Sequence, residues 1–141
     1  MKGILFLCVA NSARSQLAEG LARTILPAEV KTWSAGSRPT SVRPEAIAVL
    51  KELGIDISAH RSKAVAEIPA ALVDTVITLC GEEECPLFLG KAERRHWGLP
   101  DPAAVTGSEA TRLDAFREVR DALRNRIEGL AVEAGLHGAS R

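Results

Sequence analysis

The sequence has no tyrosine, no excess of either charge and no long apolar run. Lysine and arginine together number 18, as do aspartate and glutamate, so the formal net charge is zero. Such a chain lacks the broad basic surface of nucleic-acid-binding proteins, so any anion is recognised at a local site. The apolar runs are too short to span a bilayer, and Met1 and Lys2 lead into a predicted strand rather than a signal peptide. We therefore expect a cytoplasmic protein without nucleic-acid or membrane partners.

Cysteine is also scarce, with three residues at Cys8, Cys80 and Cys85. An odd number of cysteines in a cytoplasmic chain argues against a framework of structural disulfides. The thiols are therefore expected to be either reactive groups or inert core residues. The four residues between Cys80 and Cys85, with no partnering cysteine or histidine pair nearby, do not match a zinc site. We expect neither a metal ion nor a cofactor.

The length of 141 residues suits one domain over residues 1–141 with a single core. Buried strands are predicted where apolar residues run continuously, and helices where they recur at a period of 3.6. The expected strands are 4–8, 30–35, 74–80 and 93–97, and the expected helices are 15–26, 44–53, 67–72 and 108–134.

Strands that alternate with helices predict a parallel sheet with right-handed crossovers. The expected fold class is α/β, a three-layer α/β/α domain with a four-stranded parallel sheet. Ligands of such folds bind beyond the carboxyl ends of the strands. Cys8 and Cys80 each end a predicted strand, so both are expected at the same edge of the sheet.

The stretch after the first strand, "CVANSARS", predicts an anion-binding loop. Small residues between a strand and a helix allow backbone N–H groups to turn inward, beside the positive end of the helix dipole. Arg14 suits bidentate binding of a tetrahedral oxyanion, and this environment favours a thiolate at Cys8. Asn11 tolerates the left-handed backbone that the loop needs, and Ser15 can donate its hydroxyl to the sulfur. The expected anion-binding residues are Val9, Ala10, Asn11, Ser12, Ala13 and Arg14.

Each candidate residue also has a structural interpretation. A C-x5-R spacing arises by chance in many chains, and a free cysteine is often a small core residue. The strand before Cys8 and the helix after it favour the nucleophile. Asp101, between two prolines, is either a general acid or the start of a turn. His60 and His96 are expected to be hydrogen-bonded structural residues rather than catalysts.

Further motifs occur in order along nearly the whole chain: "CVANSARS", "QLAEG", "SAG", "VITLC" and "HWGLPDPA". Together they resemble the arsenate reductases built on the low-molecular-weight tyrosine phosphatase fold. The resemblance implies that Cys8 is the nucleophile, Arg14 the oxyanion clamp and Asp101 the general acid. Asn11 and Ser15 orient the nucleophile. The implied substrate is arsenate, with phosphate or sulfate as competing oxyanions.

The resemblance also implies a redox relay. Reducing arsenate to arsenite takes up two electrons, which two thiols supply when they become a disulfide. In the family's reductases the thiol that matches Cys80 attacks the Cys8–arsenic adduct. The thiol that matches Cys85 then resolves the Cys8–Cys80 disulfide, and thioredoxin reduces the resulting bond. Glycine and three glutamates suit a loop that rearranges, although residues 81–84 also suit a solvated turn beside an idle Cys85 thiol.

One spacing and one residue depart from the pattern of the family's reductases. The spacing between Cys80 and Cys85 is shorter than in the thioredoxin-coupled members, which leaves a low-molecular-weight thiol as an alternative to Cys85 for resolving the disulfide. Some members bind potassium through asparagine, glutamate, serine and aspartate, and Lys63 stands in place of the aspartate. We expect its ammonium to replace the ion, without stimulation by potassium. The three matching positions are Asn11, Glu19 and Ser34.

The phosphatases of this fold carry aromatic residues after their Asp-Pro, which stack on the tyrosyl ring. Here Ala103 and Ala104 follow Pro102. The sequence therefore predicts a monomeric arsenate reductase with weak phosphatase activity on small aryl phosphates. One alternative is a low-molecular-weight phosphatase acting through a phosphocysteine. A non-catalytic anion or arsenite sensor is the third interpretation, but the chain has no basic patch or recognition helix to support it.

Overall fold

The computed structural model describes residues 1–81, 88 and 90–135. In these residues the strands β1 (Gly3–Cys8), β2 (Lys31–Gly36), β3 (Thr75–Thr78) and β4 (Glu93–His96) form one four-stranded sheet. All neighbouring strands are parallel, in the order β2-β1-β3-β4. The interior strand β1 is buried at every position, as a continuous apolar run requires. The predicted α/β fold with a four-stranded parallel sheet is confirmed.

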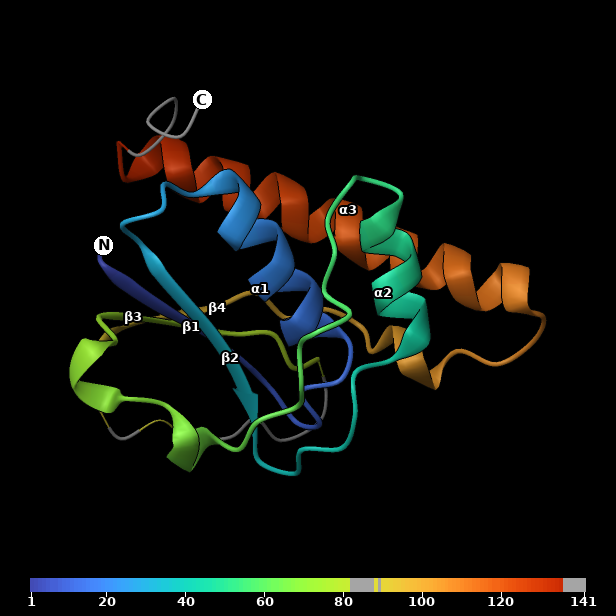
Figure 1. Ribbon diagram of the computed structural model, residues 1–141, viewed down its shortest axis with the longest axis horizontal. Helices are drawn as coiled ribbons and strands as arrows, with labels where there is room; N and C mark the ends of the chain where they lie inside the picture. The colour runs from blue at the N-terminus through green and yellow to red at the C-terminus, as the bar shows by residue number, and fades with distance from the viewer. Residues whose placement is uncertain (82–87, 89, 136–141) are drawn as a thin grey trace.

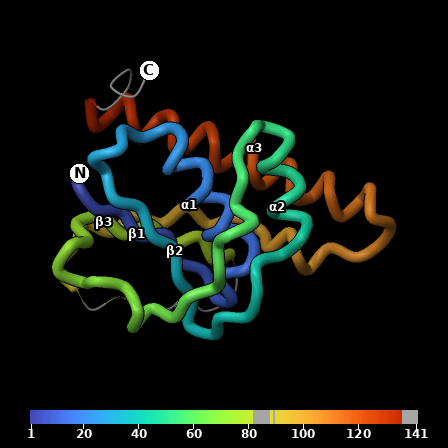
Figure 2. Tube along the Cα trace, viewed as in Figure 1, coloured from blue at the N-terminus to red at the C-terminus, as the bar shows by residue number. Residues whose placement is uncertain are grey.

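Three α-helices pack on one face of the sheet (Figure 1). They are α1 (Arg14–Ile25), α2 (Pro44–Lys51) and α3 (Glu109–Glu133). The helices share a core cluster with Ile4 and Phe6 of β1, which point to the same face because side chains alternate along a strand. The tube in Figure 2 shows α3 running along α1 and α2. Each helix lies within two residues of its predicted bounds.

The opposite face carries a smaller apolar cluster that includes Leu5 and Leu7 of β1. It is covered by two short 3₁₀ helices, η1 (Val65–Glu67) and η2 (Ala70–Leu72). The prediction of one short helix over 67–72 is wrong in this detail. Pro69 separates the two turns, because a proline has no N–H to continue a helical ladder.

The carboxyl ends of β1 and β2 meet where the functional residues lie. Cys8 is paired with Gly36 in the sheet. A Cβ atom at Gly36 would lie 2.3 Å from the carbonyl oxygen of Val9, so only glycine allows the loop after β1 to approach β2 this closely. Within the described part of the chain, no helix combines the length and apolarity of a membrane-spanning helix.

Candidate active site

A cavity of about 270 Å³ opens at the carboxyl end of β1. Its wall is the loop that joins β1 to α1, together with one side chain from the loop before η3 (Pro102–Ala104). The lining residues are Cys8, Val9, Ala10, Ser12, Ala13, Arg14 and Asp101. Five of the six predicted anion-binding residues therefore surround one space. The sixth, Asn11, is buried and does not line it.

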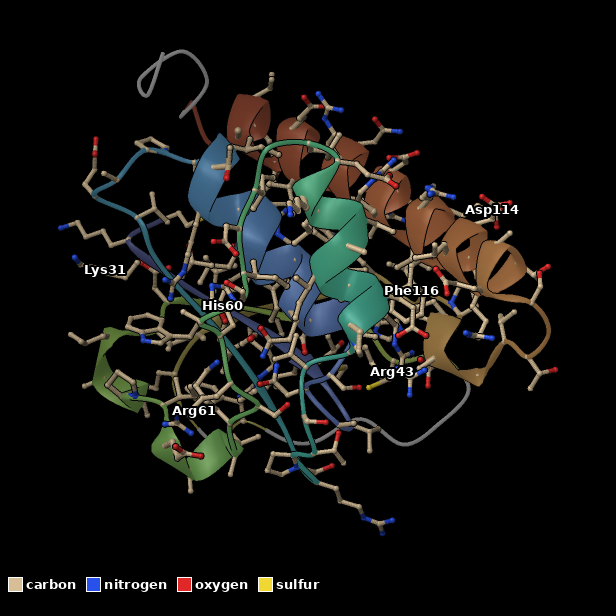
Figure 3. The ribbon with its side chains drawn as sticks, turned by 45° about the vertical axis from the view of Figure 1, so that its right-hand side comes forward. Lys31, Arg43, His60, Arg61, Asp114 and Phe116 are labelled. Carbon is tan, nitrogen blue, oxygen red and sulfur yellow. The ribbon has the colours of Figure 1, made fainter. Side chains whose placement is uncertain are left out.

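The loop between β1 and α1 is held by backbone hydrogen bonds from the segment 38–43. Backbone N–H groups of that segment donate to the carbonyl oxygens of Val9, Ala10 and Ser12, over 2.9, 3.1 and 2.9 Å. Figure 3 labels Arg43, the last of these donors, at the start of α2. Carbonyl oxygens that are held by the neighbouring segment do not face an anion in the cavity. The sequence analysis did not identify these hydrogen bonds, because backbone groups are the same in nearly every residue type and so give no signal in the sequence.

The amino end of α1 adds positive potential to the cavity. Its N-cap residue, Ala13, provides no side-chain cap, and the first turn contains no acidic residue. The first N–H groups of a helix and its dipole both favour an anion at such an end. The cavity can therefore hold an oxyanion without a dedicated metal ion.

Arg14 connects three parts of the site. Its side chain is buried, and Nη1 donates to the carbonyl oxygen of Leu99 over 2.9 Å and to that of Leu79 over 3.4 Å. Leu99 lies two residues before Asp101, and Leu79 directly precedes Cys80. The guanidinium thus links the Cys8 loop to both segments.

Cys8 is a buried free thiol at the end of β1. Its Sγ lies 2.8 Å from Ser15 Oγ, which receives a 2.7 Å hydrogen bond from Asn11 Nδ2. Asn11 has a φ of 48°, the left-handed conformation that asparagine tolerates better than most residues. The structure therefore brings Cys8, Asn11 and Ser15 together as the sequence analysis predicts.

Asp101 lines the cavity and also starts a turn. Its Oδ1 accepts a 2.9 Å hydrogen bond from the N–H of Ala103, which caps η3. The two interpretations of Asp101 are compatible, because one carboxylate oxygen can cap the turn while the side chain faces the cavity.

Cys80 lies two residues beyond β3 and is almost fully buried. It is disulfide-bonded, whereas Cys8 is a free thiol, so these two cysteines are not bonded to each other. Cys85 falls outside the described residues, as does the segment 82–84. The predicted relay through Cys85 stays a prediction.

A buried carboxylate, Glu19, lies beside the anion-binding loop. Ser34 Oγ donates to its Oε1 over 2.5 Å, and Arg23 Nη2 lies 2.8 Å from its Oε2. The ammonium of Lys63 lies 3.5 Å from Glu19 Oε1 and donates to the carbonyl oxygen of Arg61 over 3.0 Å. Two cationic side chains already balance this carboxylate, so the residues present do not fit an additional potassium ion. Among the described residues, no cluster of three or more histidine, cysteine or acidic side chains could hold a metal ion.

Both candidate structural histidines are hydrogen-bonded. His60 Nδ1 lies 3.1 Å from Gln16 Oε1, and His96 Nδ1 lies 2.6 Å from Thr78 Oγ1. Burial lowers the pKa of His60, although the neighbouring Glu19 opposes that effect. Gln16 is fully buried and was missed by the sequence analysis. The only feature of the sequence that could have indicated a role for Gln16 in the site is its position directly after Ser15.

Comparison with known proteins agrees with this geometry. The family model described as low molecular weight phosphotyrosine protein phosphatase matches residues 3–138. The chain belongs to this family. The arsenate reductase of Bacillus subtilis (strain 168) is 41% identical over 132 residues, covering 92% of this chain and 95% of that protein. The expected resemblance to the arsenate reductases of the family is confirmed.

Solved structures of arsenate reductases are also similar to this chain over nearly its whole length. "An arsenate reductase in the phosphate binding state" matches with a TM-score of 0.78 and 36% identity, over 94% of this chain and 98% of that one. A thioredoxin-dependent arsenate reductase of Corynebacterium glutamicum matches with a TM-score of 0.71 and 27% identity. That match covers 96% of this chain and 63% of the Corynebacterium chain.

Proposed function

We propose that this member of the family reduces arsenate to arsenite, with Cys8 as nucleophile, Cys80 as second thiol and thioredoxin as final electron donor. The observation that carries the proposal is the position of Arg14. Its guanidinium lines the cavity with Cys8 and bonds to the carbonyl of Leu79, the residue before Cys80. The Bacillus relative and the thioredoxin-dependent Corynebacterium enzyme support the same activity.

In the first step the Cys8 thiolate attacks the arsenic atom of arsenate. Backbone N–H groups of the loop and the Arg14 guanidinium stabilise the charge on the oxyanion. An arsenic–oxygen bond breaks, and Asp101 protonates the departing oxygen, which leaves as water. Ser15 holds the sulfur in the attacking position through its hydroxyl group.

In the second step the Cys80 thiolate attacks Cys8 Sγ. The sulfur–arsenic bond breaks and its electron pair stays on arsenic, so arsenite leaves and a Cys8–Cys80 disulfide forms. Attack of the Cys85 thiolate on Cys80 Sγ then frees Cys8. Two thiols of thioredoxin reduce the Cys80–Cys85 disulfide, which completes the transfer of two electrons.

A single-turnover experiment tests the proposal. The reduced protein is mixed with arsenate in the absence of other reductants, and arsenite and remaining free thiols are counted. We expect one arsenite released and two thiols lost per chain, with the disulfide mapped by mass spectrometry to Cys80 and Cys85. A disulfide between Cys8 and Cys80 would instead assign the resolving step to an external thiol. Retention of all thiols with no arsenite would overturn the proposal.

A small-molecule phosphatase is the second candidate function, because the family model is that of a phosphatase and the cavity suits any tetrahedral oxyanion. Replacing Cys80 with serine separates the two. We expect Cys80→Ser to abolish arsenite release while weak hydrolysis of p-nitrophenyl phosphate continues, since hydrolysis needs no second thiol. Arsenite turnover that survives this substitution would contradict the reductase mechanism.

A further inference from the structure

The strand β4 forms an edge of the sheet, far along the strand order from β2 (Figure 1). Within the described residues it pairs on one side, with β3. On that side the N–H of Glu93 donates to the carbonyl oxygen of Asp74 over 2.9 Å. Main-chain groups alternate in direction along a strand, so those of Arg94 and His96 point away from the sheet.

These two outward-facing positions are accessible. Arg94 and His96 are both exposed, and no group of the described residues is hydrogen-bonded to their main-chain N–H or carbonyl. An open edge of this kind can pair with a strand of another chain. The opposite edge differs, because in β2 Ser34 is fully buried and the N–H of Gly36 donates to the carbonyl oxygen of Lys63. Of the two edges, β4 is therefore the one that another strand can reach.

The β4 edge carries positive charge. Arg95 is paired with two glutamates, whereas the ion pairs of residues 1–81, 88 and 90–135 include none from Lys91, Arg94 or Arg126, all of which are exposed. A second copy of β4 in antiparallel pairing would place Arg95 opposite itself, and like charges in such positions are destabilising. An acidic strand would instead meet opposite charges. The edge is therefore protected against self-pairing and complementary to an acidic segment.

A cavity of about 400 Å³ lies beside this edge, between β4 and α3. Arg95 and Trp97 line it from the sheet, and Arg126, Gly129 and Leu130 line it from the helix. The Arg126 guanidinium lies 5.9 Å from the centre of the Trp97 ring. The helix side is open, because a Cβ atom at Gly129 would have no atom within 4 Å. Since side chains alternate along a strand, every second side chain of an added strand would face α3 beside this cavity.

We propose that β4 is a docking edge for an extended acidic segment of a partner protein. The segment adds a fifth strand, whose main-chain groups bond to those of Arg94 and His96. Its carboxylates lie on the sheet face to which the side chains of Arg94 and His96 point. Its apolar side chains lie on the opposite face, and one of them enters the cavity beside Gly129.

Binding of two synthetic peptides to the full chain tests the proposal. The probe is fluorescein-labelled acetyl-EVELEVE-amide, in which glutamates alternate with apolar residues, and the control is the lysine counterpart acetyl-KVKLKVK-amide. Fluorescence anisotropy measures the affinity of each. We expect saturable binding of the acidic peptide, weakened at least about threefold when the salt concentration rises from about 50 to about 300 mM, because salt screens exposed charges. We expect no saturable binding of the lysine peptide.

A proline at position 96 isolates the main-chain contribution. His96→Pro removes an N–H on the open side of β4, whereas the hydrogen bonds to β3 come from the alternate positions of the strand. His96→Ala removes the same side chain but retains the N–H, so it is the matched control. We expect the affinity for the acidic peptide to fall at least about tenfold in His96→Pro and less than about threefold in His96→Ala.

Gly129→Leu tests the cavity from the helix side, and it covers the case in which His96→Pro does not fold. Leucine suits a helix better than glycine does, and its side chain occupies the space beside Trp97. We expect the affinity for the acidic peptide to fall at least about fivefold, with less than a change of about twofold in Gly129→Ala.

Three results would overturn the proposal: no saturable binding of the acidic peptide up to about 1 mM, equal binding of the lysine peptide, or equal affinities of the folded variants and their controls. Sedimentation of the unmodified protein tests the other occupant. A concentration-dependent dimer that His96→Pro abolishes would assign the edge to a second copy of the chain and would also overturn the proposal. These measurements need no arsenate, so they are independent of the proposed reductase function.

Discussion

The two cysteine-bearing strand ends of this protein are held in different ways. Cys8, after the interior strand β1, lies in a set of side-chain hydrogen bonds with Ser15 and Asn11. The end of β3 before Cys80 is held mainly by backbone: the N–H of Leu79 donates to the carbonyl of Leu7, and the carbonyl of Leu79 accepts from the N–H of Leu99 and from the Arg14 guanidinium. Cys8 is thus held by polar side chains of its own loop, whereas the strand end before Cys80 is held by main-chain bonds and the Arg14 guanidinium. The two strand ends can therefore be tested separately, by polar and by steric substitutions in each region.

The largest effect is expected where one side chain joins the two regions. Arg14→Lys keeps the positive charge but loses the planar group that contacts Leu79 and Leu99 and that we propose binds the oxyanion. We expect kcat/KM for arsenate to fall about 100- to 1000-fold, because lysine cannot reproduce bidentate binding. Steady-state kinetics with thioredoxin check this. A fall of less than threefold would show that the two regions do not depend on this connection.

The Cys8 region can be disturbed sterically through Gly36. A Cβ in Gly36→Ala would lie 2.3 Å from Val9 O and 2.9 Å from the backbone nitrogen of Asn11, so the loop must shift. We expect the free energy of unfolding to fall by about 2–3 kcal/mol and activity to fall with it. Urea denaturation measures the former. Gly129→Ala is the matched control, since no atom lies within 4 Å of its new Cβ; it should add about 0.5–1 kcal/mol by helix propensity.

The Cys80 region has its own close approach at Gly81. A Cβ in Gly81→Ala would lie 3.0 Å from the carbonyl oxygen of Leu99, which demands a smaller shift. We expect a loss of about 1 kcal/mol in the free energy of unfolding. Arsenite release should fall more than hydrolysis of an aryl phosphate, because only reduction requires Cys80. Equal losses of both activities would mean that the two strand ends move as one unit.

The smallest effect is expected at Glu52, far along the sequence from either strand end. Hydrogen bonds from Arg117 and then Arg120 lower its pKa from 4.5 to about 2. Because the folded-state pKa lies below the unfolded value, this contribution is present above pH 4.5 and is lost as the pH falls toward 2. Glu52→Gln should therefore reduce the acid dependence of Tm across that window, with reductase activity at neutral pH unchanged. Parallel Tm profiles for the two proteins would contradict this assignment.

Much of the fold followed from local pattern. The apolar run of β1 requires burial of both faces of the strand, and the 3.6-residue period of α3 requires burial of one helix face, so the positions of both elements were predictable within two residues. The prediction for 67–72 was less accurate because a proline at 69 divides that segment.

The sequence by itself determined the parallel α/β fold and the loop from which Cys8 and Arg14 line one cavity. These features depend on residue type and short spacing, so the chain carries them locally. Only the tertiary structure decided which distant groups support that loop: the amides of 38–43, the carbonyls of Leu79 and Leu99, and His60 through Gln16. Hydrogen bonds across 29 to 85 residues depend on how strands and helices pack, and spacing along the chain does not record that packing.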